Sequence, residues 1–355
     1  MEERLVKRWL TGPLLLLTIK AAGACPLCLD AQELVYRQHA VLAAPDDGGT
    51  RFRVVEVIRG ENPTGGAIDS GSVGHLDSGA AAKGKPLLLM RANTWQSWAN
   101  LGPVGAADAG WLRELAAAKR TTEMTEGEWQ AHVAFMLPYL ENAEPMVAEI
   151  AYGELASAPY SALRSLRGRL DLQAIRQWVD DPKLAGRQRM YTLLLGIAGD
   201  ATDAAAIEQR LDAAWKTKDA TNLGPLLAAD LELRGPSRMA WIDARYIGDR
   251  DRTLQELQAA LLALSVQGGA NATIPRERVI ESYRRFIDVQ KPFAGFVAQD
   301  LAAWNDWDAV PEYIALLRSD LAQHPASRYA MWSYLKQSPR ADASAAIDAL
   351  AVTGK

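Results

Sequence analysis

Cysteine and histidine are scarce in this chain of 355 residues, and that scarcity excludes several kinds of site. Two cysteines, Cys25 and Cys28, cannot form the multiple disulfides that hold small secreted domains together. Zinc held by two thiolates would need two further ligands, and the histidines are scattered without ligand spacing. We therefore expect no metal site. The histidines are His39, His75, His132 and His324.

The chain also lacks a large excess of either positive or negative charge. The chain has 39 basic and 43 acidic residues, a formal net charge of −4, and no run of five like charges. This composition argues against a nucleic-acid partner. The basic helix at 276–285 is interleaved with acids, as in a solvated helix face. Neither Gly-x-Ser-x-Gly nor His-Glu-x-x-His occurs. We predict no catalytic residues and no cofactor.

The first residues have the order of a secretory signal peptide. Basic residues within positions 4–8 precede an apolar run from Trp9 to Ile19, and Ala22-Gly23-Ala24 resembles a cleavage site. The run is too short to remain in a membrane as a spanning helix. We expect residues 1–24 to be removed and the protein to be exported to the periplasm, the cell envelope or the medium.

Cleavage after Ala24 would make Cys25 the first residue of the mature chain. Three fates are open for it. It could carry a lipid that attaches the protein to a membrane, or form a disulfide with Cys28 in an oxidising compartment. It could also belong to a redox-active Cys-x-x-Cys motif, although the sequence around it lacks the βαβ pattern of thioredoxin-like enzymes.

Residues 25–105 read as a small β-rich domain. Short apolar runs are separated by turn signals, and 86–90 reads as a buried strand. Both faces of the segment 52–58 are partly apolar, which suits a curled sheet or barrel covered on its outside. Its alternation places Phe52, Val54 and Ile58 on one face, and Val55 and Val57 on the other.

Helical periodicity replaces alternation from residue 106 onward. We assign 106–124 to a connecting helix and linker, and 125–355 to helices in succession, opened by a capping box at Thr125 and Glu128. Breaks every 30 to 40 residues or so indicate helix pairs, the period of a solenoid. Apolar helical faces recur at Met190/Leu193/Leu194/Ile197, Ala204/Ile207/Leu211, Met239/Ile242/Tyr246 and Val310/Ile314/Leu317.

Leu195-Gly196-Ile197-Ala198-Gly199-Asp200, followed by Ile207 and Leu211, resembles a HEAT-type repeat. In such repeats one helix ends in a Leu-Gly turn, and a Gly-Asp turn starts the next. The resemblance covers about residues 125–351. It implies a HEAT-like α-helical solenoid for that part. Together with the small N-terminal sheet or barrel read from the strand pattern, the expected fold class is α+β, mainly α.

The N-terminal part is similar to netrin-like OB-fold domains. The resemblance rests on a cysteine opening the mature chain and on a strand, Phe52 to Ile58, that ends in Arg59-Gly60. Those domains usually begin Cys-x-Cys and pair with later cysteines, which this chain lacks. The arrangement also looks like an uncharacterised family of exported bacterial proteins that open with Cys-Pro-x-Cys.

Two tryptophan pairs, Trp304/Trp307 and Trp95/Trp98, could form aromatic binding surfaces, and we take Trp304 and Trp307 as the candidate site, although tryptophans three apart in helical arrays also pack between helices. Helical arrays bind partners through their surfaces. The sequence thus predicts an exported, non-enzymatic binding or scaffold protein with a protein partner. The alternatives are a thiol-disulfide oxidoreductase using Cys25 and Cys28, and a netrin-like protease inhibitor acting through the amine and carbonyl of Cys25.

Overall fold

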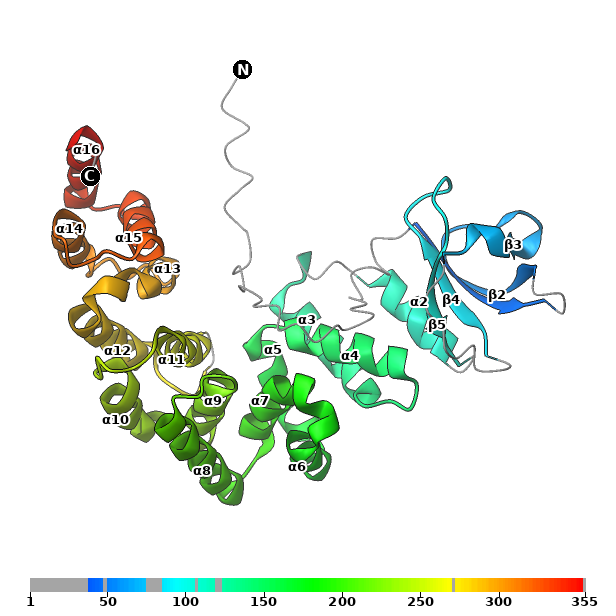
Figure 1. Cartoon of the computed structure of the whole chain (residues 1–355), viewed down its shortest axis with the longest axis horizontal. Coiled ribbons are helices and arrows are strands. Elements are labelled where there is room, and N and C mark those ends of the chain that lie inside the picture. The colour runs from blue at the N-terminus through cyan, green and yellow to red at the C-terminus, as the bar shows by residue number, and fades with distance from the viewer. Residues whose placement is uncertain are drawn as a thin grey trace. The chain divides into compact units, whose positions relative to one another are not determined.

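The computed structural model describes residues 38–46, 50–74, 85–105, 108–118, 123–269 and 272–353. The expected signal peptide and both cysteines lie outside the described residues. The chain divides into two compact units, Met1–Arg113 and Glu114–Lys355, and the division falls inside the expected linker segment. The fold is α+β and mainly α, because a small sheet is followed by many helices (Figure 1).

Five strands of the described residues form one antiparallel sheet in the first unit. Their order across the sheet is β3-β2-β1-β4-β5, so β1 lies in the middle. The two edges of this sheet meet just outside the named strands, since Val73 and Trp98 form a parallel bridge. The Trp98 amide donates to the Ser72 carbonyl at 2.8 Å, and the Gly74 amide donates to the Trp98 carbonyl at 2.7 Å. The strands are β1 (His39–Pro45), β2 (Arg51–Arg59), β3 (Ala67–Asp69), β4 (Leu87–Arg91) and β5 (Ala99–Pro103).

The alternation predicted for β2 is wrong beyond Val54. The pairing with β1 shifts between Leu42 and Ala43, so Val55 is an extra residue without an opposite partner. This β-bulge reverses the phase of the strand. Val57 therefore packs with Phe52 and Val54 against the core of Val41, Ala43, Leu89 and Trp98. Val55 is left 48% exposed.

The other face of the sheet is apolar as well, as both-sided patterning predicts. Leu42 and Leu88 are buried there. Arg113 of α2 (Ala109–Ala117) places its Nη1 2.8 Å from the Glu56 carboxylate, and Glu56 pairs with Leu42 across the sheet. The first turns of α2 thus begin on this face, where Leu112 is fully buried.

The second unit is helical throughout its described length. Capping boxes begin three of its described helices, at Thr125/Glu128 as predicted, at Asp200/Asp203 and at Thr253/Glu256. The longer helices are α3 (Glu126–Met136), α4 (Pro145–Ser157), α6 (Leu172–Asp180), α7 (Gln188–Ala198), α8 (Ala201–Thr217), α9 (Leu223–Arg234), α11 (Leu254–Gln267), α12 (Arg276–Val289), α14 (Val310–Arg318), α15 (Pro325–Gln337) and α16 (Ala341–Thr353). The shorter ones include α5 (Tyr160–Arg164), α10 (Met239–Ile242) continued by the π-helix η9 (Asp243–Ile247), η10 (Lys291–Val297) and α13 (Ala298–Ala303).

The predicted apolar faces form the core of this unit. Ala204, Ile207 and Leu211 are buried, as are all three residues of the face at 239–246 and three of the four in α7. Leu193 and Ile314 are only half-buried. The 3.6-residue period therefore located the buried side of these helices, because each helix packs on its neighbours along one stripe.

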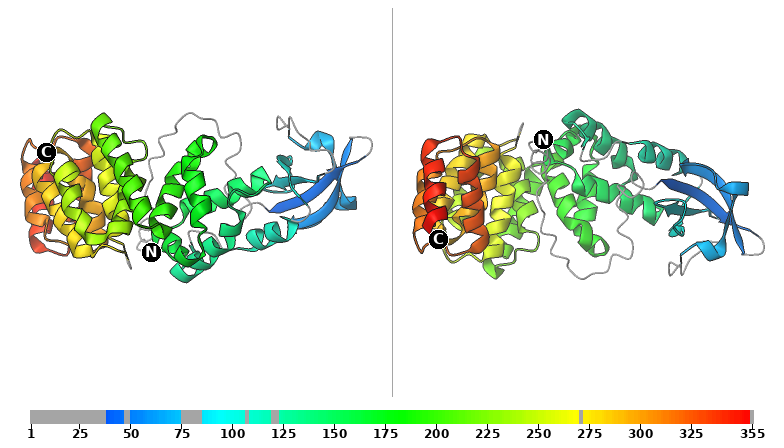
Figure 2. Two further views of the ribbon diagram at one scale, coloured as in Figure 1. Left: turned by 90° about the horizontal axis from the view of Figure 1, so that it is seen from below. Right: turned by 90° about the horizontal axis from the view of Figure 1, so that it is seen from above.

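Helices α7, α9 and α11 lie side by side, with α9 in the middle, as the labels of Figure 1 show. Figure 2 shows the helical unit from below and from above. Their backbones come close where glycine meets alanine. A Cβ added at Gly196 of α7 would meet the Ala229 Cα at 2.5 Å, and one added at Gly224 would meet the Ala259 carbonyl at 3.3 Å. Gly196 thus lies inside α7 and serves helix packing. The turn into α8 is made by Gly199 and Asp200.

Candidate functional site: a groove between α12 and α14

One wall of the groove is a face of α12. Val279, Tyr283 and Phe286 of this helix point into the core and are fully buried. Burial of the Tyr283 phenol, which donates to Asp300 at 2.6 Å, raises its pKa well above the ordinary value. The remaining face carries residues spaced three, four and seven apart, as one face of a helix requires. These are Arg284, Ile287 and Asp288, followed by Lys291 just past the helix end.

The other wall is α14 with the turn before it. Val310, Tyr313 and Leu317 turn inward and are buried, and the Tyr313 hydroxyl donates to the Ala294 carbonyl at 3.0 Å. This anchor orients α14 so that its second stripe faces the groove. That stripe and its flanks are Asp308, Ala309, Glu312, Ala315, Leu316, Ser319 and Leu321.

The cavity between these walls has a volume of about 620 Å³. That size is within the range of ligand-binding pockets. Its floor is apolar, because Ile287, Ala309 and Leu316 are each less than 9% exposed. Leu321 stands at its margin and is 54% exposed. The groove therefore combines a buried apolar floor with an exposed leucine at its edge.

Some of the charged side chains around the floor have ion-pair partners and others do not. Arg284 of α12 is 2.7 Å from Asp308 and 3.5 Å from Asp306, so its charge is already balanced across one end of the groove. Within the described part of the chain, no ion pair joins Asp288, Glu312 or Lys291 to another residue. Two carboxylates and one ammonium group are thus available to a ligand, an excess of one negative charge.

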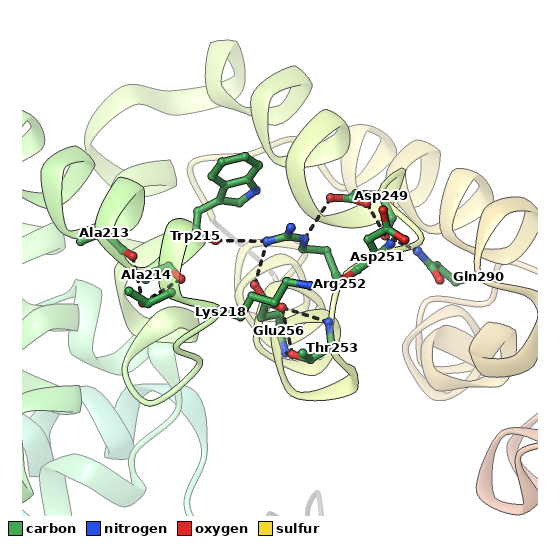
Figure 3. Close-up of polar contacts among 11 residues, drawn as sticks. Ala213, Ala214, Trp215, Lys218, Asp249, Asp251, Arg252, Thr253, Glu256 and Gln290 are labelled. Atoms are coloured by element: carbon green, nitrogen blue, oxygen red, sulfur yellow. Dashed lines mark hydrogen bonds and ion pairs between the residues drawn. The ribbon is translucent and has the colours of Figure 1, made fainter.

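A buried polar network fixes the end of α12. Gln290 is 5% exposed and donates through Nε2 to the carbonyl oxygens of Asp249, at 2.8 Å, and Ile247, at 3.4 Å. Asp249 in turn pairs with Arg252 at 2.9 Å. Figure 3 shows Arg252 between Asp249 and Glu256, with its Nη1 donating to the Trp215 carbonyl of α8 at 3.3 Å. The groove wall is therefore tied to α8 and α11 through side chains with few alternative positions.

Arg252 ends an alternating stack of guanidinium and indole groups. Going outward from it, the ring of Trp215 lies 5.0 Å from Arg252 and 5.0 Å from Arg245. The ring of Trp241 follows, 4.5 Å from Arg245 and 3.8 Å from Arg238. Every arginine in the stack also pairs with a carboxylate. Its charges are neutralised internally, so it stiffens the helices and offers no free cation.

Trp304 and Trp307, the predicted aromatic surface, pack against different helices. Trp304 stacks on Tyr283 of α12, with ring centroids 5.6 Å apart and planes inclined by 6°. Trp307 lies 5.0 Å from the ring of Tyr334 in α15. Each ring is half-buried in its own contact. The structure thus gives each ring an aromatic partner, Tyr283 for Trp304 and Tyr334 for Trp307.

Each of the three histidines in the described ranges has its own neighbours, and His75 lies outside those ranges. His132 of α3 places its Nε2 2.5 Å from the Glu154 carboxylate of α4, and both side chains are buried. His39 lies edge-on to Trp98 in the sheet, and His324 packs between Phe293 and Phe296. Among the residues that the structure describes, no group of three metal-ligating side chains occurs. The His132–Glu154 pair joins two helices at the start of the array.

Sequence reasoning missed the groove. It assigned the arginines of α12 to a solvated face, and in the structure one of them, Arg284, lines a cavity that α12 shares with α14. The available signal was the presence of small or apolar residues, Ile287 on α12 and Ala315 and Leu316 on α14, within two otherwise polar stripes. That signal becomes informative only when both stripes are known to face each other.

Comparisons with protein-family models, curated proteins and solved structures find no match to this chain. Of the helices in its described ranges, none combines the length and apolar character needed to cross a membrane. The site must therefore be interpreted from its own chemistry.

Proposed function

We propose that this protein is a non-enzymatic binding protein, and that the groove between α12 and α14 holds a segment of a partner protein. The observation that carries the proposal is the apolar floor of the groove beside an exposed leucine, Leu321. Exposed apolar surface rimmed by polar groups is the usual sign of an interaction site. A HEAT-like array supplies such surfaces without any chemistry of its own.

Two features support the architecture within this proposal. Helix pairs joined by capped turns, with α7, α9 and α11 in one row, are what a HEAT-like solenoid requires. In the first unit, β1 lies between β2 and β4, and a parallel bridge links the edges beside β3 and β5. This near-closure of five strands supports an OB-like barrel.

The signal-peptide pattern supports a site of action outside the cytoplasm. The alternatives, a thiol-disulfide enzyme and a netrin-like inhibitor, depend on Cys25 and Cys28, outside the described residues. Mass spectrometry of the protein recovered from the exporting cell would report cleavage, lipid and disulfide together. Insulin reduction by that protein, lost when both cysteines are changed to serine, would favour the redox function over ours.

The binding function is tested with a displayed library of random twelve-residue peptides, selected on the full-length protein. Ala315→Trp fills the groove from its exposed wall. Ala206→Trp is the matched control, since Ala206 is an exposed alanine of α8 away from the groove. We expect the first variant to weaken binding of the selected peptides at least tenfold and the control to leave it unchanged. Equal binding by both variants would refute the groove as the site.

A further inference from the structure

We infer that the groove recognises a peptide segment in which a lysine or arginine lies next to an apolar side chain. The inference rests on the proposed function and adds the chemistry of the partner. It starts from the two kinds of surface that the groove joins. The buried floor of Ile287, Ala309 and Leu316 suits an apolar side chain, and carboxylates stand on both walls around it.

The carboxylates on the two walls are free to bind a cation. Asp288 projects from α12 and Glu312 from α14, both are exposed, and neither has an ion-pair partner among the described residues. Arg284 is the groove residue that could instead attract an anionic ligand, but it is already paired with Asp308 and Asp306. Carboxylates bind guanidinium and ammonium groups through charged hydrogen bonds, which are about twice as strong as neutral ones.

The apolar floor decides what kind of cation fits. A small inorganic cation would leave Ile287 and Leu316 uncovered and would need more oxygen ligands than the two unpaired carboxylates supply. Lysine and arginine side chains have apolar stems that cover such surface while the charged end reaches polar groups. A neighbouring apolar residue of the same segment would cover Leu321. The cavity of about 620 Å³ has room for both side chains.

The protein's net charge of −4 acts in the same direction. Opposite charges steer association and make its rate depend on ionic strength. Lys291 is the one unpaired cation of the lining. It lies seven residues beyond Arg284, two turns away from the Arg284–Asp308 end. Its positive charge would repel a second basic residue in the part of the bound segment that lies beside Lys291.

The test uses the peptides selected on the full-length protein and copies in which norleucine or citrulline replaces each lysine or arginine. We expect the neutral copies to bind at least tenfold more weakly, and affinity to fall as salt rises. The protein variant Asp288→Asn/Glu312→Gln should lose the same preference. Glu277→Gln is the matched control, because Glu277 and Glu312 are both exposed acids in a first helical turn.

The outcomes separate the two proposals. Peptides that need the open groove but bind equally well without their charge would overturn this inference and leave the binding function standing. Peptides indifferent to Ala315→Trp would remove both. If Glu277→Gln also lost the preference for charged peptides, the effect would come from the protein's overall negative charge. That result would overturn the inference.

Discussion

The backbone of α7 at Gly196 lies so close to Ala229 of α9 that a Cβ atom at position 196 would come within 2.5 Å of the Ala229 Cα atom. Neither partner is the flexible end of a side chain, so the two helices would have to move apart. The row of α7, α9 and α11 depends on such close approaches, and the groove lies further along the same array.

Gly196→Ala should therefore destabilise the helical unit by about 1–3 kcal/mol, the usual effect of overpacking a core. Gly153→Ala in α4 is the control, because a Cβ there meets nothing within 4 Å. It should be neutral or stabilising by up to about 1 kcal/mol, since alanine is the better helix former. Urea unfolding followed by helical circular dichroism measures both. Similar midpoints for the two variants would contradict the close packing.

Val55 and Val57 test the β-bulge of β2. They would share a face in a regular strand, but here Val57 packs on the core cluster and Val55 is 48% exposed. We expect Val55→Lys to change the free energy of unfolding by less than about 0.5 kcal/mol and Val57→Lys to lower it by about 1–3 kcal/mol. Equal effects on the denaturation midpoint would mean that the strand is regular.

The same bulge shows where prediction from sequence stops. The strand itself, the capping box at Thr125 and most of the buried faces of α7 and α8 follow from local sequence patterns and were predicted correctly. The bulge depends on the register in which β1 pairs with β2, and the sequence of one strand alone does not determine that register. The groove needs Asp288 and Glu312, from separate helices, to meet across a cavity.

Arg252 tests the network behind the groove wall. Its side chain is 8% exposed and balances Glu256, which is fully buried. Arg252→Met leaves that carboxylate without its cation and should cost about 3–5 kcal/mol, as for other broken buried pairs. Arg252→Lys keeps the charge but loses the planar fork that also reaches Asp249 and Trp215, so its effect should be smaller. A thermal midpoint unchanged in Arg252→Met would disprove the role assigned to this network.

Tyr246 and Tyr313 are both fully buried but differ at the hydroxyl. The Tyr246 hydroxyl has no hydrogen-bond partner within the described structure, whereas that of Tyr313 donates to Ala294. Tyr246→Phe should therefore be neutral or stabilising, and Tyr313→Phe should cost about 0.5–1.5 kcal/mol. Urea midpoints at neutral pH compare them. A larger loss for Tyr246→Phe would show that its hydroxyl is satisfied.

Tyr246 also gives a prediction at alkaline pH. Burial raises its pKa to about 12, so the folded state favours the protonated phenol. Its contribution is fully present below the unfolded pKa of about 10 and is lost as pH rises through the folded value. Tyr246→Phe should consequently lose less stability than wild type between about pH 10 and 12. Parallel stability curves over that range would exclude this titration.

The central claim is that a partner segment lies in the groove, and photocrosslinking tests it most directly. A benzophenone amino acid placed at position 321, at the groove margin, is compared with one at position 262, where an exposed leucine of α11 lies outside the groove. Each full-length protein is irradiated with the selected peptide and the adduct is mapped by mass spectrometry. The account predicts an adduct from position 321 and none from position 262. Undiminished peptide binding with an adduct only from position 262 would contradict it.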